Sequence, residues 1–329
     1  MNGMLDYYSK LHQYREAQLL LSSIRLKVFS YLSTPKTAME IADTLNYDCR
    51  NLDIFLNSLA AIGLLESKDN KYNNTESTNR LLNENSSMYI GDTILFREEM
   101  ISLENLEERV KNGPDPKITE KKDGVGLYDF YKLAKLTRKE MYLGRVQNIL
   151  KLAETLFEKD KGFKVLDLGG GSGTLALEIA KAFPKSEVVI FEHSSVAPLP
   201  KALIEEEKLK NRARVIEGNF NVDRIGEEYD LVIASGVMDF ARHYLNDVTF
   251  KLYNSLKEKG YLYVITHGVR EDYLSPKESI VGWLSGRLNG SDLLTDEKTI
   301  LSSILSKGFK KIERKNEAAG KLKAYLFVK

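Results

Sequence analysis

The feature that most constrains the fold is a glycine-rich stretch at residues 163–181, which reads FKVLDLGGGSGTLALEIAK. An apolar run ends in three consecutive glycines, and after them apolar residues recur at helical spacing. The pattern predicts a buried strand, a tight turn and a helix. Such a turn directs the free amides at the helix start toward a ligand, and glycine lets that ligand approach the backbone. The sequence therefore predicts a ligand site at this turn.

Strands and helices alternate after the turn. Strands are predicted at 186–192, 213–217, 229–235 and 261–266, and helices at 198–209, 239–256 and 295–307, the last with Thr295 as its N-cap. Unbroken apolar strands joined by helices indicate a parallel sheet covered on both faces. The last two strands, 309–314 and 324–328, are joined by a loop too short for a crossover helix, so we expect them to be antiparallel.

The first part of the chain has the pattern of a winged helix-turn-helix. Thr37 and Glu40 form a capping box, and Gly63 is placed to end a helix as a C′ glycine. The predicted elements are a helix over 5–32, a helix through 37–45, a helix over 48–62 and a hairpin over 64–75.

The charge of this segment argues against DNA binding. Residues 33–82 contain five basic and seven acidic residues. The basic ones are Lys36, Arg50, Lys68, Lys71 and Arg80, and the acidic ones are Glu40, Asp43, Asp48, Asp53, Glu66, Asp69 and Glu76. A surface that neutralises phosphates needs the opposite balance. We therefore expect the segment to pack on a second subunit, with no nucleic-acid partner.

Between the two segments, the pattern predicts one helix over 88–111, a polar loop over 114–126, and helices over 127–157 that are interrupted near Gly144. We expect an N-terminal winged-helix dimerisation domain over 1–112, a linker with pocket-lining helices over 113–160, and a ligand-binding domain over 161–329.

Composition excludes several other classes of protein. Forty-eight basic against 47 acidic residues give no overall field that would favour nucleic acid or an anionic membrane. The lone Cys49 fits a reducing compartment, and no apolar run approaches the roughly 18 residues that a membrane span needs. No group of residues has metal-ligand spacing. We expect a cytoplasmic protein with no membrane partner and no metal.

Residues at the predicted strand ends indicate a nucleoside ligand. Glu192 ends the second strand, 19 residues after Gly173, and a carboxylate there can bind both hydroxyls of a ribose. The glycine spacing by itself also fits a dinucleotide, although such a match is weak. Asp167, two residues before the first glycine, favours a cationic amino-acid ligand, because it would repel a pyrophosphate.

The stretch VLDLGGGSG and the antiparallel last strand resemble the class I S-adenosylmethionine-dependent methyltransferases. Almost the whole chain resembles one branch, the small-molecule O-methyltransferases with an N-terminal winged-helix dimerisation domain. The matching stretches include TAMEIADTLNYDCRNLDIFLNSLAAIGLLE and SMYIGDTILF. The resemblance implies a Rossmann-like, seven-stranded α/β domain that binds S-adenosyl-L-methionine. It also implies a homodimer and transfer of a methyl group to a hydroxyl of an aromatic or conjugated metabolite.

The resemblance implies eight cofactor-binding residues at the ends of four strands. They are Asp167, Gly169 and Gly171 for the methionine part, Glu192 for the ribose, Asn219 and Phe220 for the adenine, and Ser235 and Gly236 below the sulfonium. Asn219 stands where the family usually has an aspartate, and an amide can still hydrogen-bond the edge of the adenine ring.

The chain departs from the family at the catalytic base. The family has a His-Asp-Trp stretch after the fourth strand, and here Asp239 occupies the place of the histidine. His243 lies one helical turn further on and is expected to share a face with Asp239. After the fifth strand, Thr266 replaces the family's acidic residue, and His267 follows it. The catalytic candidates are therefore Asp239, His243 and His267.

Three segments are expected to select the substrate. Residues 126–141 correspond to the family's pocket-lining helix and contain Phe130, and residues 275–288 contain Trp283, the only tryptophan. Ser275 and Glu278 are expected to form a capping box at the start of the second segment. The N-terminal helix of a partner subunit is the third, through Tyr7, Tyr8 or His12.

Other functions fit the same residues. Loss of the usual base weakens the inference to a phenolic oxygen, so N-, S- or C-methylation stays open. A winged-helix regulator with a non-catalytic, cofactor-sensing domain and an NAD-dependent oxidoreductase are further alternatives.

Overall fold

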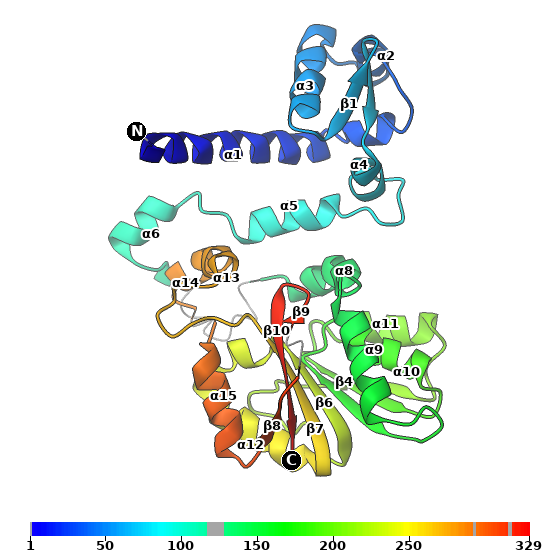
Figure 1. Cartoon of the computed structure of the whole chain (residues 1–329), viewed down its shortest axis with the longest axis vertical. Helices are drawn as coiled ribbons and strands as arrows, with labels where there is room; N and C mark the ends of the chain where they lie inside the picture. The colour runs from blue at the N-terminus through cyan, green and yellow to red at the C-terminus, as the bar shows by residue number, and fades with distance from the viewer. Residues whose placement is uncertain (1, 117–127, 292–293, 315–317) are drawn as a thin grey trace. The chain divides into compact units, whose positions relative to one another are not determined.

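The computed structural model describes residues 2–116, 128–291, 294–314 and 318–329 (Figure 1). The chain divides into two compact units, Met1–Glu99 and Met100–Lys329. The domain limits at 112 and 160 stay a prediction, and most of the predicted loop at 114–126 lies outside the described residues. Within the described ranges, no helix combines the length and the apolar character that crossing a membrane requires.

The first unit contains the elements predicted for a winged helix. Thr37 Oγ1 accepts a hydrogen bond from the amide of Glu40, whose carboxylate accepts one from the amide of Thr37, so the capping box is confirmed. Gly63 has a φ of +77°, as its place after the third helix predicts. The elements are α1 (Asn2–Arg25), η1 (Val28–Tyr31), α2 (Ala38–Leu45), α3 (Cys49–Ala61), β1 (Leu65–Lys68), β2 (Lys71–Asn74), α4 (Glu76–Leu81) and α5 (Gly91–Met100).

Two helix predictions in this part of the chain are wrong. The first helix ends at Arg25, because Lys27 adopts a left-handed conformation with a φ of 58°. The helix predicted over 88–111 is two helices, since α5 ends at Met100 and α6 spans Leu106–Asn112. In the gap between them, the amide of Glu104 donates to Ser102 Oγ at 3.4 Å, a local bond that competes with the helical ladder.

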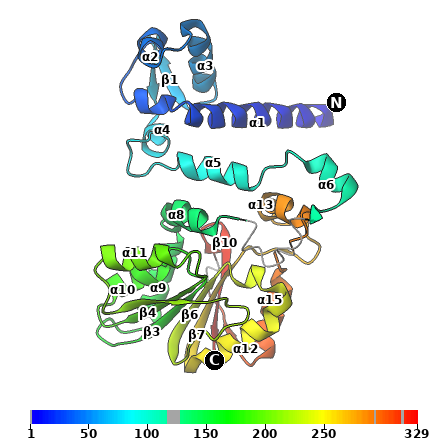
Figure 2. The ribbon, with the colours of Figure 1, turned by 180° about the vertical axis from the view of Figure 1, so that it is seen from behind.

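The second unit is built on one twisted sheet whose main path has the seven predicted strands, in the order β5-β4-β3-β6-β7-β10-β8 (Figure 1 and Figure 2). An eighth, two-residue strand, β9, pairs with β10 off this path and was not predicted. β3 to β7 are parallel to their neighbours, and β10 is antiparallel to β7 and β8, which confirms the predicted topology. The strands are β3 (Lys164–Leu168), β4 (Glu187–Glu192), β5 (Ala213–Glu217), β6 (Tyr229–Ser235), β7 (Leu256–Thr266), β8 (Lys310–Ile312), β9 (Ala318–Ala319) and β10 (Leu322–Val328).

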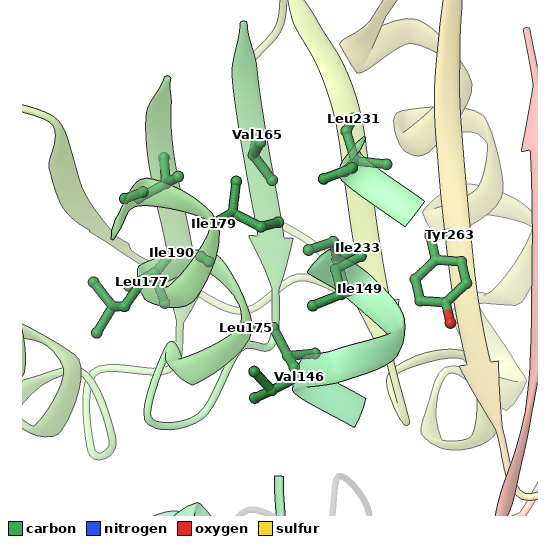
Figure 3. Packing of buried hydrophobic residues seen from close by; sticks show 14 of the residues in the cluster. Val146, Ile149, Val165, Leu175, Leu177, Ile179, Ile190, Leu231, Ile233 and Tyr263 are labelled. Carbon is green, nitrogen blue, oxygen red and sulfur yellow. The ribbon is translucent and has the colours of Figure 1, made fainter. Parts of the chain in front are cut away.

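Helices cover both faces of this sheet because its strands are apolar on both sides. Val165 and Ile190 face α9, α10 and α11, whereas Leu166 and Val189 face α12 and α15. Figure 3 shows the first of these layers, where side chains of the helices pack against the strands. The bounds of the helices in this unit from residue 130 onward, whether or not they cover the sheet, are α8 (Phe130–Met141), α9 (Arg145–Leu156), α10 (Thr174–Ala182), α11 (Pro198–Glu206), α12 (Leu245–Ser255), α13 (Lys277–Gly282), α14 (Leu284–Leu288) and α15 (Glu297–Ser306).

The helix predicted over 239–256 begins later than expected. Two short 3₁₀ turns, η2 (Met238–Phe240) and η3 (Arg242–Tyr244), precede α12. The carbonyl of Asp239 accepts from the amide of Thr295 at 2.9 Å, so it is used outside a helical ladder. Two predicted caps are also wrong. Asp296, not Thr295, caps α15, and α13 begins after Pro276, which leaves Ser275 outside the N-cap position.

Candidate active site

A cavity of about 270 Å³ lies at the carboxyl ends of β3, β4, β5 and β6. The chain runs from β3 outward to β4 and β5, then returns to β6 on the other side of β3. Loops therefore diverge at this point of the sheet, which is where open α/β sheets bind ligands. All eight residues predicted to bind the cofactor line this cavity: Asp167, Gly169, Gly171, Glu192, Asn219, Phe220, Ser235 and Gly236.

The glycine turn after β3 forms the floor of the cavity. Gly169 and Gly171 have φ values of +60° and +59°, a left-handed conformation that side chains rarely adopt. A Cβ on Gly169 would lie 2.8 Å from the side chain of Val237, and one on Gly171 would lie 3.4 Å from Ala134 of α8. Glycine at both positions therefore allows the turn to pack closely and leaves its backbone open to a ligand.

Glu192 at the end of β4 is held by two backbone amides. Its Oε2 accepts from the amide of Gly171 at 2.6 Å, and its Oε1 accepts from the amide of His193 at 2.7 Å. Burial raises the pKa of Glu192, and the two amide hydrogen bonds oppose that rise. Each carboxylate oxygen has a second lone pair, so the side chain can still accept two ribose hydroxyls.

Asp167 is a buried carboxylate near the end of β3. Its side chain is 1% exposed, and within the described part of the chain neither oxygen makes a hydrogen bond of normal geometry or an ion pair. Burial is the main cause that raises the pKa of Asp167 to about 7; the backbone amide of Ala176 lies close enough to oppose that rise, and the negative charge of Glu192 adds to it. A buried carboxylate without a cationic partner is costly, so a cationic ligand that pairs with it would bind favourably.

The loop after β5 brings Asn219 and Phe220 to the cavity. Asn219 Oδ1 accepts a hydrogen bond from the backbone amide of Asn221 at 3.0 Å. The side-chain nitrogen, Nδ2, is then the group of Asn219 that can donate to a ligand. The ring of Phe220 lies 3.9 Å from the position that a Cβ on Gly169 would occupy, so it stands beside the glycine turn. The two residues can contact the edge and the face of a purine.

None of the three catalytic candidates is among the residues lining this cavity. Asp239 is fully buried, and its Oδ1 accepts from Thr266 Oγ1 at 2.8 Å and from the amide of His267 at 3.1 Å. His243 is exposed on η3, and its predicted common helical face with Asp239 is wrong, because two separate 3₁₀ turns carry the residues.

His267 lies between an acid and an indole. Its Nδ1 is 3.3 Å from Asp239 Oδ1, although the two atoms are not aligned as a hydrogen bond. Its Nε2 accepts from Trp283 Nε1 at 3.3 Å. This arrangement favours the tautomer with its proton on Nδ1, and it gives Nε2 the lone pair that a base requires.

Aromatic side chains form the wall of the cavity on the side of His267. Phe130 and Phe240 line the cavity. Trp283 does not line it, but its ring centroid is 5.1 Å from that of Phe240 and 5.8 Å from that of His267. Tyr128 contacts both Phe130 and Trp283, at 6.0 and 6.1 Å. Phe130 and Trp283 could be predicted from the sequence, whereas Phe240 and Tyr128 were not.

Comparison with known proteins identifies the family. Residues 103–281 match the O-methyltransferase domain, and residues 8–84 match the O-methyltransferase dimerisation domain. The chain belongs to the O-methyltransferase family. It is an S-adenosylmethionine-dependent methyltransferase that acts on a small molecule, and it forms a homodimer through its N-terminal domain.

Individual relatives are distant but cover most of the chain. An uncharacterized protein of Methanocaldococcus jannaschii is 29% identical over 261 residues, which are 78% of this chain and 67% of that protein. The N,N-dimethyltransferase OxyT of Streptomyces rimosus is 26% identical over 256 residues, covering 76% and 74%. The structure of human N-acetylserotonin methyltransferase in complex with S-adenosylmethionine superposes with a TM-score of 0.76 at 20% identity, covering 100% of this chain and 97% of that one.

The charges of the cavity fit the cofactor of this methyltransferase. S-adenosylmethionine carries a positive amino group and sulfur, which match Asp167, and a carboxylate, which Arg145 can match. Arg145, the first residue of α9, lines the cavity, and its guanidinium contacts Met141 Sδ at 3.4 Å. The sequence analysis missed Arg145. Its place directly after Gly144, at the break between two predicted helices, was the available signal.

The N-terminal helix has an exposed apolar face that suits the dimerisation domain of this family. The exposed side chains on α1 are 53–73% accessible in this single chain: Met4, Leu5, Tyr7, Tyr8, Leu11 and Tyr14. His12 on the same helix is exposed too. Whether Tyr7, Tyr8 or His12 reaches the partner's substrate stays a prediction. In the part of the chain that the structure describes, no group of His, Cys, Asp and Glu side chains could hold a metal ion.

Proposed function

We propose that this methyltransferase binds S-adenosylmethionine in the cavity at the ends of β3 to β6 and methylates an aromatic or conjugated metabolite there. One observation carries the proposal: a single cavity combines a buried carboxylate without a cationic partner, Asp167, with the aromatic wall of Phe130 and Phe240. The carboxylate suits the cationic end of the cofactor. The rings suit a flat acceptor, because aromatic pairs stabilise one another beyond simple area burial.

Each part of the cofactor has its own set of residues in this proposal. The methionine part is held by Asp167, Gly169, Gly171 and Arg145, the ribose by Glu192, and the adenine by Asn219 and Phe220, with Ser235 and Gly236 beneath the sulfonium. When bound, the cofactor supplies a methyl group activated by a positively charged sulfur. The residues of this chain orient the acceptor and exclude water around it.

Orientation is the larger contribution to the rate. Holding the acceptor atom about 3 to 3.5 Å from the methyl carbon can supply roughly 7 to 11 kcal/mol. A positioned base typically supplies about 10² to 10⁴ in rate, near 3 to 5 kcal/mol. The enzyme can therefore act without the family's usual histidine, and a base elsewhere in the site would add the smaller term.

We propose His267 as that base for a hydroxyl acceptor. Trp283 Nε1 now occupies the lone pair of Nε2, and an acceptor hydroxyl that reached the same lone pair would lose its proton to His267. Asp239, 3.3 Å from Nδ1, would stabilise the protonated imidazole. Asp239 is then a positioning residue. His243 has the weakest support of the three candidates, because it is exposed on η3.

The accepting atom is the finer part of the proposal. The family name favours oxygen, whereas the relative OxyT is named an N,N-dimethyltransferase, so an amine is the second candidate. An amine would need less help from His267, since the neutral form is already nucleophilic. We also place the enzyme in the cytoplasm, on the basis of its single cysteine, Cys49.

The test is methyl transfer from radiolabelled S-adenosylmethionine to a metabolite extract, followed by mass spectrometry of the labelled product. We expect label in a small aromatic product, and none with a Glu192→Ala variant. Cofactor binding without any turnover would instead support the cofactor-sensing regulator and contradict the proposal. A labelled aliphatic product would contradict the aromatic acceptor alone.

A further inference from the structure

Lys251 of α12 reaches the loop that carries Asn219 and Phe220. Its Nζ donates to the backbone carbonyl of Phe220 and, at 3.0 Å, to that of Asp223. Lys251 is not among the residues lining the cavity. It therefore acts on a ligand only through this loop.

The loop is a closed turn, and Phe220 and Ile225 pack against the core on one face of the sheet. Asn219 donates its amide to Asp223 Oδ2 at 2.7 Å, and the amide of Asp223 donates to the carbonyl of Asn219 at 2.8 Å. These bonds fix the shape of the turn. Its entry is fixed by the amide of Gly218, which donates to the carbonyl of Glu192 at 3.1 Å. At the far side of the turn, the ammonium of Lys251 supplies the corresponding anchor.

The surroundings of Lys251 are partly buried, and its bond to the carbonyl of Phe220 is the more buried of the two. The side chain is half-buried. Burial lowers the pKa of Lys251, while the charges of Asp223 and Asp247 oppose that change. An ammonium directed at two carbonyl oxygens makes charge-assisted hydrogen bonds, which are stronger than neutral ones and define the position of their acceptors.

We propose that Lys251 is a positioning residue for the adenosine part of the cofactor. By binding the backbone carbonyl of Phe220, Lys251 sets the position of the Phe220 ring over the glycine turn. By binding the carbonyl of Asp223, it fixes the residue whose carboxylate accepts from the backbone amide of Asn219. The slot for the adenine is then formed before the cofactor arrives, so binding loses less conformational entropy. This inference rests on the proposed assignment of Asn219 and Phe220 to the adenine.

The experiment measures the Kd of two probes by calorimetry. S-adenosylhomocysteine contacts the whole cofactor site, whereas 5′-methylthioadenosine lacks the amino-acid part. We expect Lys251→Met to weaken both probes by the same factor, about 10- to 100-fold, because two hydrogen bonds to a charged group are lost. Lys251→Arg should recover much of the loss, since it keeps the charge and the donors.

Lys257→Met is the matched control. Lys257 is also partly buried and donates to both oxygens of Asp230, at 2.9 and 2.8 Å, but at the amino-terminal edge of the sheet, away from the cavity. The Lys257→Met variant should leave the Kd values of both probes unchanged. A double-mutant cycle with Phe220→Leu gives a second readout. If Lys251 acts through the Phe220 ring, Lys251→Met should weaken binding of the probes only slightly when Phe220 is already replaced by Leu.

The outcomes separate this inference from the proposed function. If the wild-type protein binds neither probe, the assignment of the cavity fails. If the wild type binds and Lys251→Met binds equally well, the role of Lys251 is overturned. If Lys251→Met loses far more affinity for S-adenosylhomocysteine than for 5′-methylthioadenosine, the effect is not confined to the adenosine part, and the inference is likewise overturned. Should Lys251→Met not fold, Lys251→Gln serves in the same comparison.

Discussion

The two walls of the cavity are built in different ways. The cofactor wall is a product of backbone geometry: the left-handed glycines Gly169 and Gly171 shape it, and the amide of Gly171 fixes Glu192. The acceptor wall consists of side chains from segments far apart in sequence: Phe130 and Phe240 line the cavity, and Trp283 packs behind Phe240. A wall made by backbone depends on a short local pattern. A wall made by side chains exists only after the whole domain has folded.

The walls also differ in charge. The cofactor wall keeps two carboxylates close together, and burial raises the pKa of both. The acceptor wall is apolar except for the pair of Asp239 and His267 behind it. Changes in the cofactor wall should therefore alter the Kd of the cofactor and the stability of the fold. Changes in the acceptor wall should alter kcat.

The largest effect is expected from Glu192→Ala. Loss of charge-assisted hydrogen bonds to two ribose hydroxyls should weaken cofactor binding by about 3 to 6 kcal/mol, while the far-ultraviolet circular dichroism stays the same. Glu217→Ala is the matched control, because Glu217 pairs in register with Glu192 on β5, is exposed, and forms an ion pair with Lys201. Micromolar affinity retained by Glu192→Ala in calorimetry would count against the cofactor wall as described.

His267→Gln should act on the other wall. We expect kcat for a hydroxyl acceptor to fall by about 10², the lower end of the usual range for a base, because Trp283 already occupies part of Nε2. The KM for S-adenosylmethionine should not change. His243→Gln, at an exposed position, should leave both constants as they are. Equal losses of kcat in His267→Gln and His243→Gln would contradict the assignment of His267, and not His243, as the base.

Asp167→Asn should change the stability of the fold and the affinity for the cofactor in opposite directions. The pKa of about 7 in the folded protein lies above the ordinary value of 3.8, so the folded state retains a proton that the unfolded state releases. Stability therefore falls as the pH rises from about 4 to 7. The variant should be more stable than wild type at pH 8 by about 1 to 3 kcal/mol, with a smaller gain at pH 5, as measured by urea unfolding.

The same substitution should weaken cofactor binding at pH 8, because the cation loses its partner. In the wild type, the Kd for S-adenosylmethionine should rise as the pH falls below 7, and the variant should lose that dependence. A pH-independent gain in stability would contradict the charge assigned to Asp167.

The smallest effect is expected from Trp283→Phe, which keeps a ring and removes the N–H. The lost hydrogen bond to His267 should cost about 0.5 to 1.5 kcal/mol of unfolding free energy, and kcat should change by less than about tenfold. A fall in kcat as large as that of His267→Gln would show that the indole itself takes part in the reaction.

The difference between the walls also explains what the sequence could predict. The strand, the turn and the helix around Gly169 follow local rules, and so does the capping box of Thr37 and Glu40. The contacts of Asp239 do not. Its bonds to Thr266 and His267 and to Thr295 join segments distant in sequence, and the helix predicted to begin at Asp239 begins only at Leu245. Phe240 joins the acceptor wall for the same tertiary reason, and no periodicity in the sequence signals it.

The most direct test of the central claim is a crystal structure of the protein grown with S-adenosylhomocysteine. We predict the amino group beside Asp167, the ribose hydroxyls on Glu192, and the adenine against Phe220, with the sulfur facing Phe240. An empty cavity, or one that accepts only a pyrophosphate compound, would contradict the account of both walls.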